Sequence, residues 1–352
     1  MTKNTFYYLG FSHFFGIGPL KLKQLIAYYG SVKKAYQANI NEKFVEFRKN
    51  FDPEKKLAEF KKKNITVLTW EDKNYPQLLK MISDPPICLY VRGEFDFNHY
   101  QNYFAVVGTR NPTSYGRQIT QKLTFELAAA GFIIVSGLAI GIDSLAHLAT
   151  LEAEGKTVAV LGCGVDIIYP AENNYLYWQI IKKGGAIISE FPPGQMVKKG
   201  LFIARNRIIS GLSQGVIIVE GLKISGSLIT ARFAAEQGRE VFAPPSPITS
   251  QMSEAPNLLL KEGAKLVTGI NDILEEFKIK ITPKQKENIF KKLTQEEKEI
   301  YELVAKEALS ADEISRAKKI SVAKTLNFLS LLEIKGAVEK DKQGKYLGKI
   351  IS

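Results

Sequence analysis

The sequence predicts an α/β fold with a mostly parallel central sheet and a smaller, largely helical region on each side. Short runs rich in valine and isoleucine alternate with helical patterns in the middle of the chain, as in repeated strand–helix–strand units. These runs are apolar almost throughout, as expected for strands covered on both faces. A polar, basic linker at residues 278–284 then precedes further helical patterns. We therefore expect three domains, at residues 1–72, 73–280 and 281–352.

The first region, residues 1–72, is expected to consist of short helices. Apolar residues recur there at helical spacing, at Leu20, Leu22, Leu25, Ile26 and Tyr29. The preceding turn, Gly16-Ile17-Gly18-Pro19, resembles the hairpin of helix-hairpin-helix modules, which offer backbone N–H groups to a phosphate at a helix start. A role in packing or protein interaction is the alternative for this turn.

The central region carries the pattern of a parallel sheet. The expected strands cover residues 104–107, 132–135, 158–161, 186–189, 216–219 and 240–242. The expected helices between them include residues 116–130, 142–154 and 227–237. This alternation predicts that each strand runs into a loop and then a helix on one face of the sheet.

The C-terminal region carries the pattern of a winged helix. Thr294 with Glu297 forms a capping box at the start of a first helix. Further helices are expected from Ser310 and from Ser321. Two short strands are then expected at residues 336–340 and 345–347, around a Lys342-Gln343-Gly344 turn.

Composition narrows the classes of partner. The net charge of +12 favours a polyanion such as nucleic acid or an anionic membrane, although solubility or a lysine-rich genome would also account for it. No apolar run of about 18 residues and no signal-like N-terminal stretch is present, so we expect a cytoplasmic protein that does not span a membrane. Two distant cysteines, Cys88 and Cys163, fit a reducing compartment. With three histidines besides, ligands for a zinc site are too few, and we expect no metal.

The ends of the predicted strands are rich in glycine and polar residues. The segments are Gly108-Thr109-Arg110-Asn111, Ser136-Gly137-Leu138-Ala139, Gly162-Cys163-Gly164, Ser189-Glu190 and, after Val219-Glu220, Ser225-Gly226-Ser227. Ligands of open α/β sheets bind outside the carboxyl ends of the strands. Glycine lets a backbone approach an anion closely, and helix N-termini present free N–H groups. Any one of these glycines also suits a tight turn, but together they predict a groove for successive phosphates.

Arginines stand between the last two of these segments. Arg205 and Arg207 flank Asn206, and arginine binds phosphate with two parallel hydrogen bonds. Phe202 nearby is a candidate for stacking on a base. The alternative is structural: an arginine pairs with Glu190 or Glu220, and Phe202 belongs to the core.

Taken together, these segments resemble the DNA-processing protein A (DprA/Smf) family over about residues 75–280. The motifs are Val107-Gly108-Thr109-Arg110-Asn111-Pro112, Ser136-Gly137-Leu138-Ala139 with Gly141-Ile142-Asp143 and His147, Leu161-Gly162-Cys163-Gly164 with Asp166 and Tyr169-Pro170, Arg205-Asn206-Arg207, and Ser225-Gly226-Ser227. The resemblance implies an extended Rossmann-like domain between an N-terminal SAM-like and a C-terminal winged-helix-like domain. It also implies a homodimer, formed through the Rossmann-like domain, that binds single-stranded DNA and helps load the RecA recombinase during natural transformation. Neither catalysis nor a cofactor is implied.

The resemblance and the strand ends together give a set of expected DNA-binding residues. They are Gly108, Thr109, Arg110, Ser136, Gly137, Gly162, Gly164, Phe202, Arg205, Asn206, Arg207, Ser225, Gly226 and Ser227. The sequence departs from the family pattern at Ile140, where a basic residue is usual, and at Ile203, where proline is usual. The loop at residues 243–260 lacks two of the usual glycines. We expect the lost cation at Ile140 to weaken DNA affinity.

Two other functions compete with this one. Nucleoside-monophosphate phosphoribohydrolases share a related fold, but their double-glycine loop and downstream glutamate are absent around Glu220. Neither a dinucleotide-binding Gly-x-Gly-x-x-Gly nor a P-loop occurs, so oxidoreductase and ATPase functions are not supported. The second competitor is a regulator that reads duplex DNA with the winged helix, where Lys318, Lys319 and Lys324 stand near the third helix.

Overall fold

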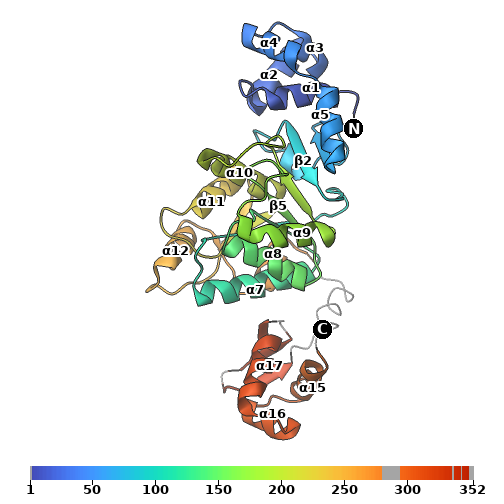
Figure 1. The fold of residues 1–352 in the computed structure, drawn as a ribbon. Coiled ribbons are helices and arrows are strands. Elements are labelled where there is room, and N and C mark those ends of the chain that lie inside the picture. Colours follow the sequence, from blue (N-terminus) through green and yellow to red (C-terminus); the bar gives the residue numbers. More distant parts are fainter. Residues whose placement is uncertain (1, 280–293, 335–336, 342, 349–352) are drawn as a thin grey trace.

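The computed structural model describes residues 2–279, 294–334, 337–341 and 343–348. The expected linker at residues 278–284 lies outside the described residues from position 280 onward. The central sheet is the largest unit, with the N-terminal helices at one end of it (Figure 1).

Within the described residues the central sheet has nine strands in the order β1-β2-β6-β5-β4-β3-β7-β8-β9. The strands are β1 (Ile65–Thr69), β2 (Cys88–Arg92), β3 (Tyr103–Val107), β4 (Ile133–Ser136), β5 (Thr157–Val160), β6 (Ala186–Ser189), β7 (Gly215–Ile218), β8 (Glu240–Ala243) and β9 (Lys265–Leu266). From β6 to β9 every neighbouring pair is parallel. The mostly parallel α/β fold predicted from the sequence is therefore confirmed.

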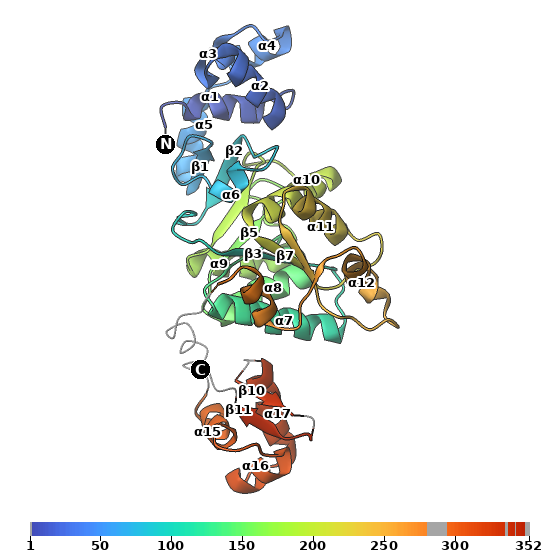
Figure 2. The same ribbon diagram turned by 180° about the vertical axis from the view of Figure 1, so that it is seen from behind.

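Helices cover both faces of the sheet. Successive side chains of a strand point to opposite faces, and because these strands are apolar almost throughout, both faces must be buried. On one face Ala105 and Val107 of β3 pack with Ile208 of α10. On the other face Phe104 and Val106 pack with residues of α7 and α8. The helices are α6 (Gln77–Lys80), α7 (Ser114–Ala129), α8 (Ile142–Glu152), α9 (Asn174–Lys182), α10 (Lys199–Leu212), α11 (Gly226–Glu236), α12 (Glu254–Lys261) and α13 (Ile270–Glu276). Figures 1 and 2 show α7 and α8 on one side and α10 and α11 on the other.

The N-terminal region contains α1 (Thr5–His13), α2 (Pro19–Tyr29), α3 (Val32–Gln37), α4 (Glu42–Asn50) and α5 (Pro53–Lys62). Its core is aromatic, with Phe11 stacked on Phe44 at 5.0 Å between ring centroids. The expectation of helices alone needs a correction here, because residues 65–69 form β1 and pair antiparallel with β2. A hydrogen bond of 2.9 Å between the Ser12 and Tyr90 hydroxyls joins α1 to β2. The first helices are therefore attached to the edge of the central sheet.

The C-terminal region has the winged-helix fold expected for it. Its elements are α15 (Gln295–Val304), α16 (Ala311–Lys318), α17 (Val322–Ile334), β10 (Val338–Lys340) and β11 (Tyr346–Gly348). Capping boxes begin the first two helices, at Thr294 with Glu297 and at Ser310 with Glu313. The two strands pair antiparallel, and a separate apolar cluster fills the space between helices and hairpin.

The order in which the chain adds strands to the sheet reverses between the neighbouring strands β3 and β7. The chain proceeds from β3 outward through β4, β5 and β6, whereas β7 leads through β8 to β9 on the other side. The loops that leave β3 and β7 therefore diverge, and such a switch point opens a crevice at the carboxyl ends of the strands. Gly141, at the start of α8, packs against the β3 loop with φ of +89°, and a Cβ there would lie 2.5 Å from the carbonyl oxygen of Thr109.

Gly141→Ala is expected to lower the free energy of unfolding by about 1–3 kcal/mol through backbone strain, with the clash against the Thr109 carbonyl adding to it. Gly200→Ala is the control, because Gly200 lies in α10 and a Cβ there would meet nothing within 4 Å. That variant should keep or slightly raise the stability. Urea denaturation measures both, and equal midpoints for the two variants would contradict this account of the β3 loop.

Candidate nucleic-acid interface

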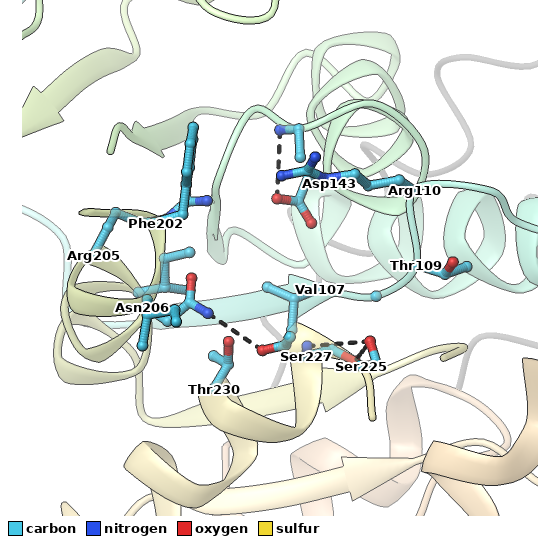
Figure 3. A pocket seen from close by; sticks show the side chains of 15 residues that line it. Val107, Thr109, Arg110, Asp143, Phe202, Arg205, Asn206, Ser225, Ser227 and Thr230 are labelled. Carbon is cyan, nitrogen blue, oxygen red and sulfur yellow. Dashed lines mark hydrogen bonds between the residues drawn. The ribbon is translucent and has the colours of Figure 1, made fainter. Parts of the chain in front are cut away.

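A pocket of about 290 Å³ lies at the switch point of the sheet. Its walls come from the end of β3 and the following loop, the β4–α8 loop, the middle of α10 and the start of α11 (Figure 3). Nine of the residues expected to bind DNA line it: Gly108, Thr109, Arg110, Phe202, Arg205, Asn206, Ser225, Gly226 and Ser227. Segments distant in sequence thus meet at the place that the strand ends predicted.

Backbone contacts fix the loop that follows β3. The Thr109 N–H donates to the carbonyl oxygen of Glu220 at 2.8 Å, and the Ile142 N–H donates to the carbonyl of Thr109 at 3.1 Å. Gly108 sits so close to Ile142 that a Cβ would lie 2.7 Å from its Cγ1. Glycine is needed here because α8 and β7 both approach the backbone. The loop is therefore held between the ends of two neighbouring elements.

Glu220 holds the far end of the same loop. Its buried carboxylate accepts hydrogen bonds from the backbone N–H of Thr113, at 2.9 Å, and from the Thr113 hydroxyl. Thr113 in turn caps α7 by accepting from the N–H of Gly116. The carboxylate thus stabilises the beginning of α7, and it does not line the pocket.

Arg110 and Phe202 face each other across the mouth of the pocket. Arg110 is exposed, and its guanidinium carbon lies 5.8 Å from the centroid of the Phe202 ring. Tyr169 adds a second aromatic ring at 5.6 Å from Phe202. Gly162 lies beneath Phe202, where a Cβ would come within 2.8 Å of the ring. The arrangement places a cation beside accessible aromatic surface.

Arg205 is buried and holds the floor of the pocket together. Its Nη1 donates to the carbonyl of Gly137 at 2.7 Å and to the carbonyl of Val160, so it joins the ends of β4 and β5. Asp143 lies alongside and accepts hydrogen bonds from the N–H groups of Gly137 and Ala139. Burial raises the pKa of Asp143, and the Arg205 guanidinium opposes that shift. Burial lowers the pKa of Arg205, and Asp143 opposes it in turn.

The start of α11 forms the opposite wall. Ser225 caps the helix, and its hydroxyl lies 2.8 Å from that of Ser227. A Cβ at Gly226 would meet nothing within 4 Å, so this position is open to the pocket. The Asn206 side-chain amide donates to the Gly226 carbonyl at 3.3 Å and connects α10 to this wall. Hydroxyl groups and a helix N-terminus here suit an anion.

Five expected residues lie elsewhere. Gly137 lines a smaller adjoining cavity of about 50 Å³, together with the exposed Ile140. Ser136 is buried and donates to the Val106 carbonyl. Gly162 supports Phe202 from below, and Gly164 packs against residues 192–194.

Arg207, the fifth, does not enter the pocket. Its guanidinium donates to both oxygens of Glu190, at 2.7 Å each, and to Asp84 at 2.8 Å. Arg207 therefore forms the ion pair with Glu190 that the sequence offered as the structural alternative to DNA binding. The Glu190 side chain is nearly as buried as that of Arg207. The guanidinium is occupied by these carboxylates.

Sequence reasoning left several lining residues out of the expected set. Asp143 and Tyr169 were part of the motifs but were not expected to form the site, and Thr230 lies one helical turn beyond Ser227. Helical spacing from Ser227 would have been a signal for Thr230. Ile203, the departure from the family pattern, is exposed on the pocket wall.

The winged helix presents a different surface. The third helix, α17, exposes Val322, Leu326 and Leu331. Lys318 pairs with Glu299 at 3.0 Å, and Thr325 is buried. The exposed face of α17 is therefore mixed, with the polar side chains of Lys324, Asn327 and Ser330 among these apolar ones.

Among the described residues, no helix is long and apolar enough to cross a membrane. Within the same residues, no group of three or more His, Cys, Asp or Glu side chains is placed to hold a metal ion.

The fold and the pocket together define a class: Rossmann-like proteins with a polar switch-point pocket, here joined to a winged helix. Residues 66–278 match the family model described as DNA recombination-mediator protein A, and residues 287–344 match the DprA winged helix domain. The chain therefore belongs to the DNA recombination-mediator protein A (DprA/Smf) family, which confirms the resemblance of its motifs.

Relatives similar in sequence and structure agree with this assignment. The chain is 39% identical over 284 residues to Protein Smf of Synechocystis sp., covering 76% of this chain and 71% of the relative. It is 44% identical over 220 residues to the DNA processing protein DprA of Bacillus subtilis, covering 62% and 74%. The X-ray structure of DNA processing protein A from Streptococcus pneumoniae superposes with a TM-score of 0.69 at 36% identity, covering 78% of this chain and 99% of that one.

A second solved structure is that of DNA processing protein A from Helicobacter pylori, described for its single-stranded DNA binding mode. It superposes with a TM-score of 0.55 at 34% identity, covering 60% of this chain and 95% of that one.

Arg207→Ala is expected to lower the free energy of unfolding by about 3–5 kcal/mol, because it leaves the buried Glu190 without its partner. Arg232→Ala is the control, since Arg232 pairs with Glu236 on the exposed face of α11. Breaking such a surface pair costs about 0.3–0.5 kcal/mol. Chemical denaturation compares the two variants, and a loss for Arg207→Ala as small as that of the control would show that the pair is not structural.

Proposed function

We propose that this protein binds single-stranded DNA in the switch-point pocket, with little sequence preference. The observation that carries the proposal is the pairing of exposed Arg110 with the Phe202 ring, opposite the start of α11. A guanidinium and a helix N-terminus suit phosphates, and an aromatic ring stacks on any base.

The walls of the pocket support this assignment of roles. Arg110 carries its charge at the mouth, whereas the charge of Arg205 lies on the floor beside Asp143. A strand laid across the mouth would meet Arg110 first, with the hydroxyls of Ser225 and Ser227 on the far wall. Contacts of this kind position a backbone without reading its sequence.

We further infer a role as a recombination mediator in the cytoplasm, which protects incoming or recombining DNA and helps load RecA during natural transformation. Family membership supports this role, and the related protein of Helicobacter pylori is described by its binding of single-stranded DNA. A homodimer formed through the Rossmann-like domain belongs to the same proposal.

A binding function is favoured over catalysis. Glu220, which stands where phosphoribohydrolases carry their catalytic loop, is buried and bonded to Thr113. Asp143 is engaged by two backbone N–H groups beside Arg205. These hydrogen bonds give both carboxylates a structural role, which favours binding over catalysis. Incubation with AMP-type nucleotides, scored for release of the base, tests the enzymatic alternative directly.

Duplex reading by the winged helix is the weaker alternative. Lys324, Asn327 and Ser330 are exposed on α17 as donors to base edges, but they are interspersed with the exposed apolar side chains of Val322, Leu326 and Leu331. Competition between oligo-dT and an unrelated duplex for the full chain measures the preference.

Arg110→Ala is expected to weaken binding of oligo-dT by about tenfold to a hundredfold, since one charge-assisted phosphate contact is worth roughly 1.5–3 kcal/mol. The salt dependence should flatten by about one phosphate, or roughly 0.7 counterions on a single strand. The melting temperature should stay near that of the parent, because Arg110 is exposed and forms no ion pair within the described residues.

Arg117→Ala is the matched control, an exposed arginine one turn into the neighbouring helix α7 that does not line the pocket. It should bind oligo-dT almost as the parent does. Unchanged affinity in Arg110→Ala would show that the DNA does not occupy this pocket.

A further inference from the structure

A second, larger cavity lies away from the switch point. It is an open cavity with a volume of about 690 Å³, lined by the turn between α5 and β1, the end of β2 and the second half of α9. Its lining includes Lys61, Asn64, Thr66, Arg92, Trp178 and Lys182. Figure 1 shows α5 beside β2 at this edge of the sheet.

The two cavities are independent of each other. They share no lining residue. Arg92 is paired with Ile187 near the amino end of β6, and Gly93 packs on the Gly185 carbonyl just before that strand. The switch-point pocket instead lies at the carboxyl ends of β3 and β7. A ligand in one cavity therefore contacts none of the residues that line the other.

Cations dominate this second cavity. Lys61, Arg92 and Lys182 line it, against the single carboxylate of Glu94. Both lysines are exposed, and neither has an ion-pair partner in the described parts of the chain. Lys156 stands at the border, with its ammonium 3.3 Å from the position of a Cβ on Gly184. Such a cluster of unpaired cations attracts a polyanion.

An aromatic platform lies among these cations. Trp178 is 44% exposed, and the guanidinium carbon of Arg92 lies 4.9 Å from its ring centroid. Arg92 also donates to the Tyr177 hydroxyl at 3.3 Å, which fixes the guanidinium beside the ring. A guanidinium beside a half-exposed indole combines a cation with an aromatic surface on which a base can stack.

We propose that this cavity is a second binding site for single-stranded nucleic acid, which holds a segment of strand separate from the one in the switch-point pocket. The proposal takes its ligand class from the proposed function but rests on its own residues. Phosphates bind Lys61 and Lys182, a base stacks at Trp178, and Asn64 and Thr66 offer neutral groups to base edges. An acidic protein segment would use the lysines but would leave the aromatic platform without a partner.

Intrinsic fluorescence tests the proposal, because the chain has two tryptophans and only Trp178 is substantially exposed. Trp70 is 8% exposed and donates its indole N–H to the Pro86 carbonyl. Oligo-dT added to Arg110→Ala should quench the fluorescence, and quenching should be lost in Arg110→Ala combined with Trp178→Phe. Tyr175→Phe, on the same helix but outside the cavity, should leave the quenching unchanged.

Charge reversal gives a second readout. Lys61→Glu with Lys182→Glu, made in the Arg110→Ala protein, should reduce oligo-dT affinity by at least about tenfold through the loss of phosphate contacts. Lys62→Glu with Lys183→Glu changes the net charge equally at neighbouring exposed positions that do not line the cavity. This control pair should change the affinity by less than about threefold, because it alters only the long-range field.

The outcomes separate this proposal from the first one. Quenching in the parent but not in Arg110→Ala would overturn the second site while leaving the switch-point pocket in place. Binding of oligo-dT by neither protein would overturn the proposed function itself. Displacement of oligo-dT from Arg110→Ala by polyglutamate at equal charge concentration and constant salt would show a surface for acidic proteins, and would also overturn the second site.

Discussion

The buried guanidinium of Arg205 joins three parts of the structure at one point. It reaches from α10 to the carbonyls that end β4 and β5, and it lies beside Asp143 at the start of α8. Removing an arginine from such a place takes a hydrogen-bond donor from two buried carbonyls and the neighbouring cation from the buried carboxylate of Asp143, which costs far more than a surface contact. The shape of the switch-point pocket therefore depends on a residue that is itself closed off from solvent.

The arginines in and around the pocket have different roles. Arg205 and Arg207 are occupied by carbonyls and carboxylates within the fold, whereas Arg110 stands exposed at the mouth. The rigid floor positions the exposed cation, because the β3 loop is bonded to Glu220 and to α8. A surface built in this way is preorganised, so the proposed binding of a strand would need little ordering of the protein.

Features encoded locally could be predicted from the sequence. Capping boxes at Thr294 and Ser310, the buried strands and the glycine-rich strand ends depend on neighbours within a few residues. Glu190 could be named as a possible partner of Arg207, but its second partner could not be predicted, because Asp84 lies 123 residues away. Strand β1 was missed because five residues beside a lysine run show no clear alternation, and the strand exists only through its pairing with β2.

The central claim is that a single strand lies across the switch-point pocket, and a crystal structure of the full chain with a short oligo-dT tests it most directly. We predict a phosphate oxygen within about 2.7–3.2 Å of the Arg110 guanidinium, and a thymine stacked on Phe202. A strand bound elsewhere, with Arg110 still in solvent and the start of α11 unoccupied, would contradict the account.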